Sequence, residues 1–360
     1  MRYERTEKTL RIVQLSHSEH GRRVAVVEEP WLRLLRDCSS VYELAQLAIR
    51  SNRPLRGCVE QFVSDQQVPY DEMYDSRSDP PGGNGGWQLL PPIDHPEPSR
   101  CFVTGTGLTH KGSAENRQSM HATAATTAPL NSEPRTPNPP ATDSMKMFQI
   151  GLEGGTPAAG CIGAAPEWFY KGVGTILRAH NQPLTVPSHA LDGGEEAEIA
   201  GVYLIGADGT PFRIGLTQGN EFSDHVLESK NYLYLAESKL RDCALGPELV
   251  IEPNFNDVPG HSTIERDGKI IWQAAQASGE RWMCHSLANL EHHHFKHAEH
   301  RRPGDVHIHF FGADMFSYKD RLRLEDGDLM TISFAGCGRP LRNPIRITRS
   351  EQELVVVKSL

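Results

Sequence analysis

The chain has 360 residues, which is enough to bury a full hydrophobic core and to form two domains. Asp and Glu number 46 against 37 Lys and Arg, and this net charge of -9 argues against a nucleic-acid-binding protein. Seven scattered cysteines without a C-x-x-C pair indicate reduced thiols. The first ten residues lack an apolar stretch, and no segment approaches the roughly 20 apolar residues that cross a bilayer. We therefore predict a cytoplasmic protein without a membrane partner.

Residues 1–77 predict a small N-terminal α+β domain. Two apolar runs within residues 10–29 have the composition of strands and are separated by a polar turn. Residues 41–51 then carry apolar side chains at helical spacing, with Ser39 or Ser40 as the N-cap. A strand pair followed by a helix is the expected arrangement.

Residues 78–97, rich in Gly and Pro, predict a linker to a larger domain that spans residues 98–360. Within that domain, residues 122–143 contain hardly any large apolar residue and predict a mobile loop or lid. Many short apolar runs and few helices predict a β-rich α+β fold of the roll or barrel type. The runs are residues 198–205, 212–217, 269–275, 305–312, 328–335 and 353–359.

Three glutamates, Glu195, Glu196 and Glu198, lie at the start of the apolar run 198–205. Because side chains alternate along a strand, Glu196 and Glu198 share one face, whereas Glu195 is expected to point the other way into solvent. A hairpin that ends near residue 221 would return Glu221 to the same place. Neighbouring carboxylates that are removed from water need a positive partner, and hard oxygen ligands suit Mg²⁺, Mn²⁺ or Ca²⁺. The alternative is a solvated strand face.

A histidine-rich segment, residues 291–302, holds His293 and His297 at a spacing that can bind zinc on a helix. Charged neighbours and the absence of a nearby third ligand predict a solvated helix end instead. The H-I-H run at residues 307–309 is expected to be structural.

The runs E-A-E-I-A, G-N-E-F-S and E-S-K-L-R-D-C-A-L-G-P resemble the signature of the fumarylacetoacetate-hydrolase superfamily. The runs P-G-D-V-H-I-H-F-F-G-A and G-D-L-M-T-I-S-F-A-G-C-G-R-P-L-R-N resemble its closing strands. Within the superfamily, the segment that ends in A-L-G-P looks most like the 2-keto-3-deoxy sugar-acid dehydratases. The resemblance covers roughly residues 100–345. It implies a β-roll or sandwich catalytic domain and a homo-oligomer, either a dimer or a tetramer.

The resemblance also implies roles for four acidic and basic residues. Glu196 and Glu198 match the E-x-E metal ligands, and Glu221 matches a third ligand that is usually Asp. Lys239 matches the lysine that faces the substrate beside the metal. An ammonium group near three carboxylates offsets their charge and can stabilise an oxyanion.

The corner at residues 105–117 lies where the family's hydrolases carry a His-and-Glu-containing segment. His110 and Glu115 are the candidates for acid-base catalysis, and Thr106 and Thr109 are the candidates for binding a substrate carboxylate. Ala313 lies in the substrate loop, where this chain lacks the hydroxyl group of the family's T-G-T-P sequence.

These features predict the Mg²⁺-dependent dehydration of a pentonate-like 2-keto-3-deoxy sugar acid to a dioxo acid, in sugar-acid catabolism. Two alternatives stay open. The pair His110 and Glu115 favours a hydrolase that cleaves a C–C bond of a 2,4-diketo-3-deoxy sugar acid or an acylpyruvate. The missing loop hydroxyl and the glutamate at position 221 favour a sugar-acid-binding protein without catalysis.

Overall fold

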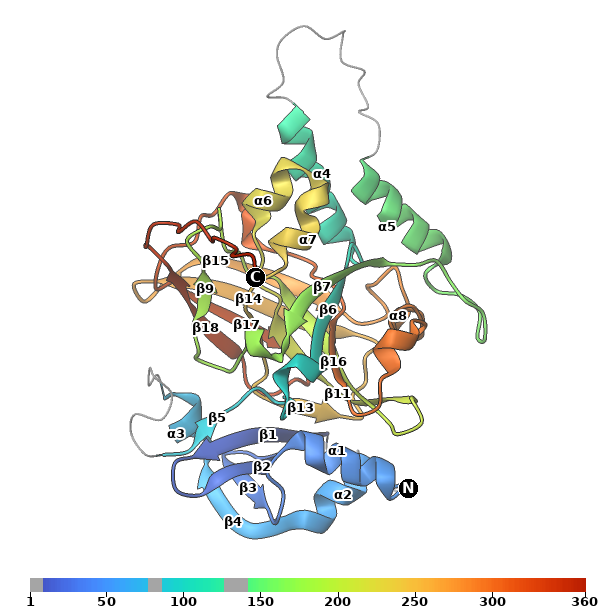
Figure 1. The fold of residues 1–360 in the computed structure, drawn as a ribbon, viewed down its shortest axis with the longest axis vertical. Helices are drawn as coiled ribbons and strands as arrows, with labels where there is room; N and C mark the ends of the chain where they lie inside the picture. Colours follow the sequence, from blue (N-terminus) through green and yellow to red (C-terminus); the bar gives the residue numbers. More distant parts are fainter. Residues whose placement is uncertain (1–8, 77–85, 126–141) are drawn as a thin grey trace, which may run out of the picture.

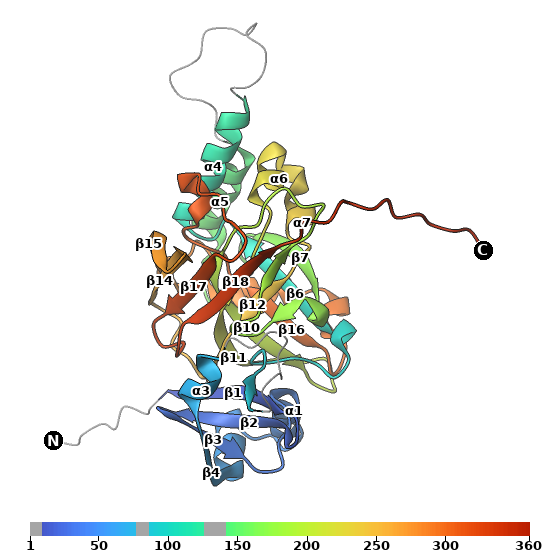
Figure 2. The same cartoon turned by 90° about the vertical axis from the view of Figure 1, so that its left-hand side faces the viewer.

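The computed structural model describes residues 9–76, 86–125 and 142–360 as two sheets with helices at both ends of the molecule (Figures 1 and 2). The predicted loop or lid falls largely on residues 126–141, which lie outside the described part, and so does most of the first half of the predicted linker. Residues 122–125 belong to the end of a helix, and Asp143 begins the next one.

The larger sheet contains thirteen strands in the described part of the chain. They are β1 (Leu10–His17), β2 (Gly21–Glu28), β3 (Trp31–Leu35), β4 (Val63–Pro69), β5 (Gln88–Leu89), β6 (Cys101–Gly107), β7 (Glu167–Val173), β8 (Leu177–Arg178), β10 (Ala197–Ile205), β11 (Pro211–Asn220), β12 (Cys243–Leu245), β13 (Leu249–Ile251) and β16 (Val306–Phe310). Its main order is β4-β3-β2-β1-β13-β11-β10-β16-β6-β7, which places β10 and β11 near the middle.

The smaller sheet has the order β15-β14-β17-β18-β9. Its strands are β9 (Leu184–Val186), β14 (Val258–Arg266), β15 (Lys269–Ser278), β17 (Leu329–Phe334) and β18 (Leu341–Ile347). The α-helices are α1 (Val41–Arg50), α2 (Leu55–Phe62), α3 (Tyr70–Tyr74), α4 (Lys111–Ala125), α5 (Asp143–Gly154), α6 (His225–Lys230), α7 (Leu235–Ser238) and α8 (Leu287–Phe295). The 3-10 helices are η1 (Pro98–Arg100), η2 (Gly174–Ile176), η3 (Tyr232–Tyr234), η4 (Ala298–Arg301) and η5 (Ser317–Asp320). None of the helices that the structure describes is both long and apolar enough to cross a bilayer.

The N-terminal segment contains the predicted antiparallel strand pair and helix, but a third strand, β3, lies between β2 and α1. Ser40 caps α1, because its side chain accepts a hydrogen bond from the backbone N–H of Glu43. Strand β1 also pairs with β13, with Leu10 opposite Ile251, so the N-terminal strands continue the large sheet. In Figure 1 they lie at the end of the molecule opposite to helices α4, α6 and α7.

Strand β10 is buried along its whole length because both of its faces are covered. Ala200, Val202 and Leu204 pack in one core, on the side of α1. Ile199 packs in a second core, which includes Phe334 of the smaller sheet. The antiparallel partner β11 returns from the turn at Gly209, where φ is +83°. This hairpin brings the end of β11 back beside the start of β10.

Two sequence-based expectations are wrong. The run 353–359 forms no strand but lies in an exposed C-terminal tail, which projects from the body of the molecule (Figure 2). The histidine-rich segment is not simply a solvated helix end, because His294, which belongs to α8, is buried. There it meets His307 and His309, which β16 presents on one face.

A hydrogen-bond chain holds this histidine layer. The indole N–H of Trp168 donates to Nδ1 of His294 at 3.2 Å, and Nε2 of His294 lies 3.0 Å from Nδ1 of His307. Nδ1 of His309 lies 2.8 Å from the hydroxyl of Thr104. Burial, together with neighbouring histidines, lowers the pKa of His307 and the pKa of His309 to about 3. The fold therefore keeps these imidazoles neutral.

The histidine layer predicts a loss of stability in mild acid. An unfolded histidine has a pKa of about 6.5, so below that pH the unfolded chain takes up protons that the fold excludes. The free energy of unfolding should fall as the pH decreases from 7 to 4. Urea denaturation across this pH range gives the slope of the free energy of unfolding against pH. In His309→Leu this slope should be smaller than in the wild type, by the equivalent of about one proton taken up on unfolding.

The control variant is His261→Gln, which replaces an exposed histidine on β14. It should keep the pH dependence of the wild type. An undiminished dependence in His309→Leu would contradict the assignment of the acid sensitivity to this layer.

Candidate metal and catalytic site

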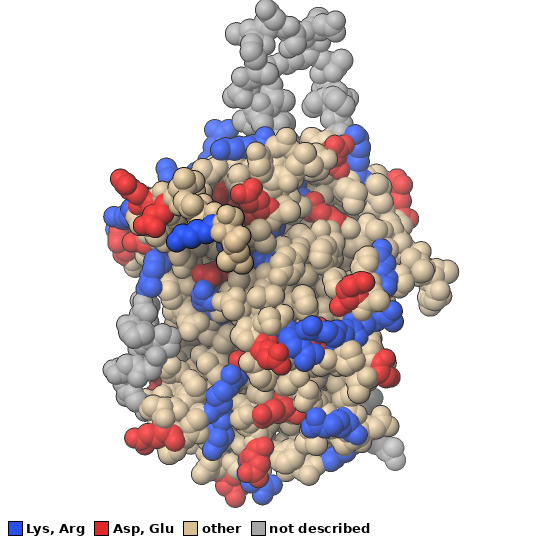
Figure 3. All heavy atoms as spheres, in the orientation of Figure 1, with Lys and Arg blue, Asp and Glu red and all other residues tan. Residues whose placement is uncertain are grey.

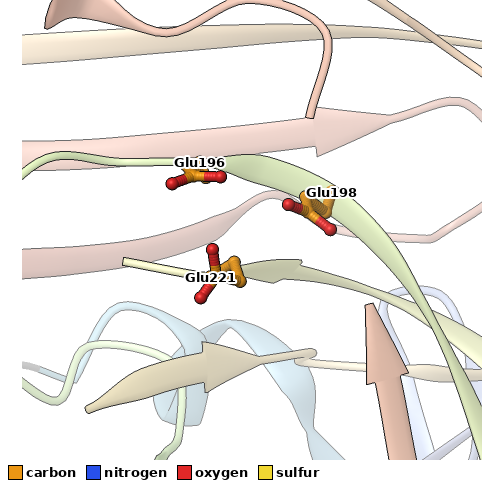
Figure 4. A group of neighbouring side chains, drawn as sticks. All are labelled: Glu196, Glu198 and Glu221. Carbon is orange, nitrogen blue, oxygen red and sulfur yellow. The ribbon is translucent and has the colours of Figure 1, made fainter. Parts of the chain in front are cut away.

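Three buried carboxylates meet at the start of β10 and the end of β11. Glu196, Glu198 and Glu221 each place an oxygen within 4.8 Å of the others, and their side chains turn toward a common space (Figure 4). The β10–β11 hairpin sets this geometry, because Ala197 pairs with Asn220 and the N–H of Glu221 donates to the carbonyl of Glu196 at 2.9 Å. The expected return of Glu221 to Glu196 and Glu198 is confirmed.

Two buried lysines contact the carboxylates. Lys239 Nζ lies 2.5 Å from both Glu196 and Glu221, and it donates to the Ser223 hydroxyl at 2.9 Å. Lys171 Nζ lies 2.7 Å from the other oxygen of Glu221 and donates to the carbonyls of Phe222 and Lys239. Burial disfavours a charged amine, but the carboxylates of Glu196 and Glu221 outweigh it and raise the pKa of Lys239. The ammonium group is therefore held in its charged form.

Glu198 differs from the other two glutamates because no cation contacts it within the described residues. Its Oε2 accepts the N–H of Gly312 at 2.7 Å, and its Oε1 has no hydrogen-bond partner there. Burial, with the charges of Glu221 and Glu196, holds the pKa of Glu198 well above its usual range. Burial also acts on Glu196, but Lys239 and His225 outweigh it and hold the pKa of Glu196 well below its usual range. A buried carboxylate without a cation is what a metal ion would stabilise.

The expectation that Glu195 is solvated is wrong. Its side chain is buried, and its two oxygens accept hydrogen bonds from the backbone N–H of Ser317 at 2.6 Å and from the Ser317 hydroxyl at 2.8 Å. Because η5 covers this side of the chain, the face opposite to the one that Glu196 and Glu198 share is buried as well. Glu195 therefore anchors η5 and lies outside the cluster of three carboxylates.

His110 lies directly before α4 and is buried. The hydroxyl of Thr109 donates to the carbonyl of Phe311 at 2.7 Å and lies 2.9 Å from Nδ1 of His110. Since this hydroxyl has one proton, Nδ1 must be the donor to it, which leaves Nε2 unprotonated. Nε2 has no partner among the described residues. Burial lowers the pKa of His110 to about 4, so the ring is neutral near pH 7.

The other candidates from the sequence are placed differently. Glu115 is exposed on α4, where its carboxylate lies 3.6 Å from Lys111 Nζ. Thr106 is buried and donates its hydroxyl proton to the carbonyl of Phe310. Neither threonine hydroxyl can donate to a substrate carboxylate without giving up its backbone carbonyl. Ala313 is buried in a small apolar cluster with Met120.

Several polar residues of the site were not predicted from the sequence. His225 Nε2 lies 3.0 Å from Glu196, and its ring stacks on Phe316. The spacing of Glu221, Ser223 and His225, two residues apart, was a usable signal for a shared face. Lys171 stands in the aromatic run W-F-Y-K, and a lone lysine in such a strand is a signal of a buried cation.

Comparisons with known proteins agree with this geometry. No family model matches the chain. Over 130 residues the chain is 28% identical to a probable 2-keto-3-deoxyxylonate dehydratase of Haloferax volcanii. The matched stretch is 35% of this chain and 43% of that relative, so the chain spans less than half of the relative's length.

The fold is matched over nearly the whole chain by solved structures of 2-keto-3-deoxy-D-arabinonate dehydratase. The TM-score is 0.65 at 18% identity, over 94% of this chain and 100% of that one. The chain shares the fold of this dehydratase. One of those structures is a complex with magnesium and 2,5-dioxopentanoate. The expected β-rich, fumarylacetoacetate-hydrolase-like α+β fold is confirmed.

A 5-carboxymethyl-2-hydroxymuconate delta-isomerase from Mycobacterium smegmatis also matches, with a TM-score of 0.54 at 16% identity. That match covers 94% of this chain and 100% of the isomerase. Because lyases and isomerases both match, the fold alone does not select the reaction.

Replacing Glu198 should separate stability from metal binding. Glu198→Gln keeps an acceptor for Gly312 and removes a buried carboxyl group that no cation compensates, so the metal-free protein should melt at the same or a higher temperature. Divalent cation affinity should fall at least tenfold, about 1.4 kcal/mol, in calorimetric titration with Mg²⁺. Glu72→Gln on the surface of α3 is the control. Wild-type affinity in Glu198→Gln would contradict the metal site.

Replacing Lys171 should destabilise the fold itself. Lys171→Met leaves Glu221 with one cation in place of two, and breaking a buried ion pair costs about 3–5 kcal/mol. Urea denaturation should report a loss of this order in the free energy of unfolding. Adding Glu221→Gln to Lys171→Met should recover part of the loss, because the uncompensated charge is then gone. A single variant as stable as the wild type would show that the lysine is dispensable.

Proposed function

We propose that the protein is a Mg²⁺-dependent dehydratase of a 2-keto-3-deoxy sugar acid, with a pentonate-like substrate and a dioxo acid as product. The observation that carries the proposal is the buried group Glu196, Glu198 and Glu221 with Lys239 between two of its members. The partial likeness to a 2-keto-3-deoxyxylonate dehydratase supports the same reaction. So does the fold shared with a dehydratase solved with magnesium and 2,5-dioxopentanoate.

Glu196, Glu198 and Glu221 are the residues that would hold the ion. Three hard oxygen ligands suit Mg²⁺, and magnesium is the ion named in the related complex, whereas Mn²⁺ and Ca²⁺ have no such support. When bound, the ion would act as a Lewis acid toward the keto group of the substrate and so acidify its C3 protons.

Lys239 provides a fixed positive charge at the site. Glu196, Glu221 and Ser223 orient its Nζ, and the ring of Phe169 lies 4.9 Å away on another side. A charged amine that is already oriented stabilises negative charge developing on a substrate oxygen without reorganisation. We assign this role to Lys239.

His110 is the proposed base. Its unprotonated Nε2 is buried and has no partner among the described side chains. It can take a proton from C3, and the C4 hydroxyl departs with a proton as water. A 2-keto-3-deoxypentonate loses one water in this step and gains a C3=C4 double bond. Movement of a proton from C5 to C3 then gives the C4=C5 enol, which tautomerises to 2,5-dioxopentanoate. A base with a pKa near 4 holds the proton only briefly, which suits its transfer to the departing hydroxyl.

We also propose that the protein is cytoplasmic and forms a homo-oligomer. In the described chain, the tail residues Leu354, Val355, Val356 and Val357 are each at least 73% exposed. Exposed apolar side chains in a row are typical of surfaces that a partner covers.

On the face shown in Figure 3, positive and negative side chains of the described residues are interspersed, which favours a small anionic substrate over nucleic acid.

The function is tested by product analysis. Purified protein with Mg²⁺ is incubated with 2-keto-3-deoxypentonate, or in a parallel sample with a 2,4-diketo-3-deoxy sugar acid, and both are followed by NMR. We expect 2,5-dioxopentanoate from the first substrate, and we expect its formation to stop with EDTA. Pyruvate from the second substrate would establish the C–C hydrolase instead. Binding without any product would favour the non-catalytic sugar-acid-binding protein.

A further inference from the structure

Asn116 is a buried amide whose hydrogen bonds are unmade. Its side chain is 0% exposed, and neither its amide nitrogen nor its amide oxygen has a partner among the described residues. Each unpaired buried polar group costs about 1–3 kcal/mol. A protein interior rarely keeps such groups without a use for them.

Helix α4 is held so that Asn116 cannot turn outward. The neighbouring Arg117 lies 2.7 Å from Glu167 of β7 and 2.6 Å from Glu228 of α6. Met120, one turn further along, is buried on the same side of the helix, whereas Lys111 and Glu115 are exposed on the other. The position of Asn116 is therefore fixed by its neighbours.

Contacts connect α4 and the residues before it with the carboxylate site. The helix follows His110 and Thr109, and Thr109 bonds the carbonyl of Phe311, next to the Gly312 that donates to Glu198. In Figure 1, α4 rises beside α6 and α7, and α7 immediately precedes Lys239. Arg117, the residue next to Asn116, pairs with Glu228 of α6, and α6 begins at His225, whose Nε2 lies 3.0 Å from Glu196.

Asn116 is one of several residues in this region with buried side-chain atoms that have no hydrogen-bond partner in the described structure, and both of its amide atoms are among them. For two of the others, Nε2 of His110 and Oε1 of Glu198, the proposed reaction supplies uses. An amide offers both a donor and an acceptor. A substrate carboxylate or ketone could use only its N–H groups, whereas a hydroxyl can use the donor and the acceptor together.

We infer that Asn116 binds a substrate hydroxyl remote from the 2-keto acid group, and so selects a hydroxylated chain. In a 2-keto-3-deoxypentonate this is the C5 hydroxyl, since the C4 hydroxyl is the one that leaves. The inference rests on the proposed function and narrows its substrate class to polyhydroxy acids over acylpyruvates. A site built to bond a hydroxyl rejects an analogue that lacks it, because its own polar groups then stay unpaired.

If the inference is right, replacing Asn116 should keep or raise the stability of the protein and lower its selectivity between substrates. Asn116→Leu replaces two unpaired polar atoms by an apolar group of similar size, so the melting temperature of the ligand-free protein should stay the same or rise. A structural asparagine would lower the melting temperature when replaced. The selectivity for the hydroxylated acid should fall.

The experiment uses full-length protein with Mg²⁺ and two acids, 2-keto-3-deoxypentonate and 4-hydroxy-2-oxopentanoate, which lacks only the C5 hydroxyl. Calorimetric titration gives Kd, and NMR gives turnover. Wild type should prefer the hydroxylated acid at least tenfold in Kd, and Asn116→Leu should reduce this preference to threefold or less. Gln149→Leu, an exposed amide on α5, is the matched control and should keep the wild-type preference.

An unchanged preference in Asn116→Leu would overturn the inference, and so would a wild type that binds both acids equally. If Asn116→Leu does not fold, Asn116→Ala is measured in the same way. Failure of the proposed function is distinguishable, because it would appear as an absence of product from wild type even where binding discriminates between the two acids.

Discussion

Burial of three neighbouring carboxyl groups at one point is the constraint on which the site depends. Glu196 and Glu221 can be removed from water because two lysines compensate them, whereas no cation contacts Glu198 among the described residues. Lys239 follows α7, and Lys171 comes from β7. Both must reach the end of the β10–β11 hairpin for the fold to be stable. The electrostatic requirement therefore fixes the relative position of three segments that are distant in sequence.

The two lysines have different surroundings, and this difference separates structure from chemistry. The protein uses all three N–H donors of each lysine, and those of Lys171 go to Glu221 and two backbone carbonyls. Lys239 contacts two of the carboxylates and a hydroxyl, and it lies beside Glu198, the one carboxylate of the three without a cation in the described structure. The unbalanced charge is thus concentrated where an ion and a substrate would bind.

Local patterns predicted the parts of the site that depend on one hairpin. Alternation placed Glu196 and Glu198 on one face, and the length of the turn returned Glu221 to them. The same alternation failed for Glu195, because it gives the direction of a side chain but not what covers that direction. Only the fold brings Ser317 against it.

The buried histidines and Asn116 also could not be predicted, because local sequence patterns do not show which elements pack against a side chain. β16 presents His307 and His309 to α8 through pairing with β6 and β10, and no local pattern contains that pairing. The prediction of a strand at residues 353–359 was wrong for a different reason. This apolar run suits a strand, but it has no strand partner within the described chain. The unpaired amide of Asn116 could be recognised only once its surroundings were known.

The pairing of Leu10 with Ile251 has a consequence for biosynthesis. Strand β1 leaves the ribosome well before its partner β13, because β13 lies far downstream in the chain. Until then, the edge of β1 that β13 will cover is open to other strands, and such edges promote mispairing. Closing a loop of this length is also slow. Completion of the central sheet is therefore a late event, and the nascent N-terminal unit depends on its own hairpin and on α1 to stay compact in the meantime.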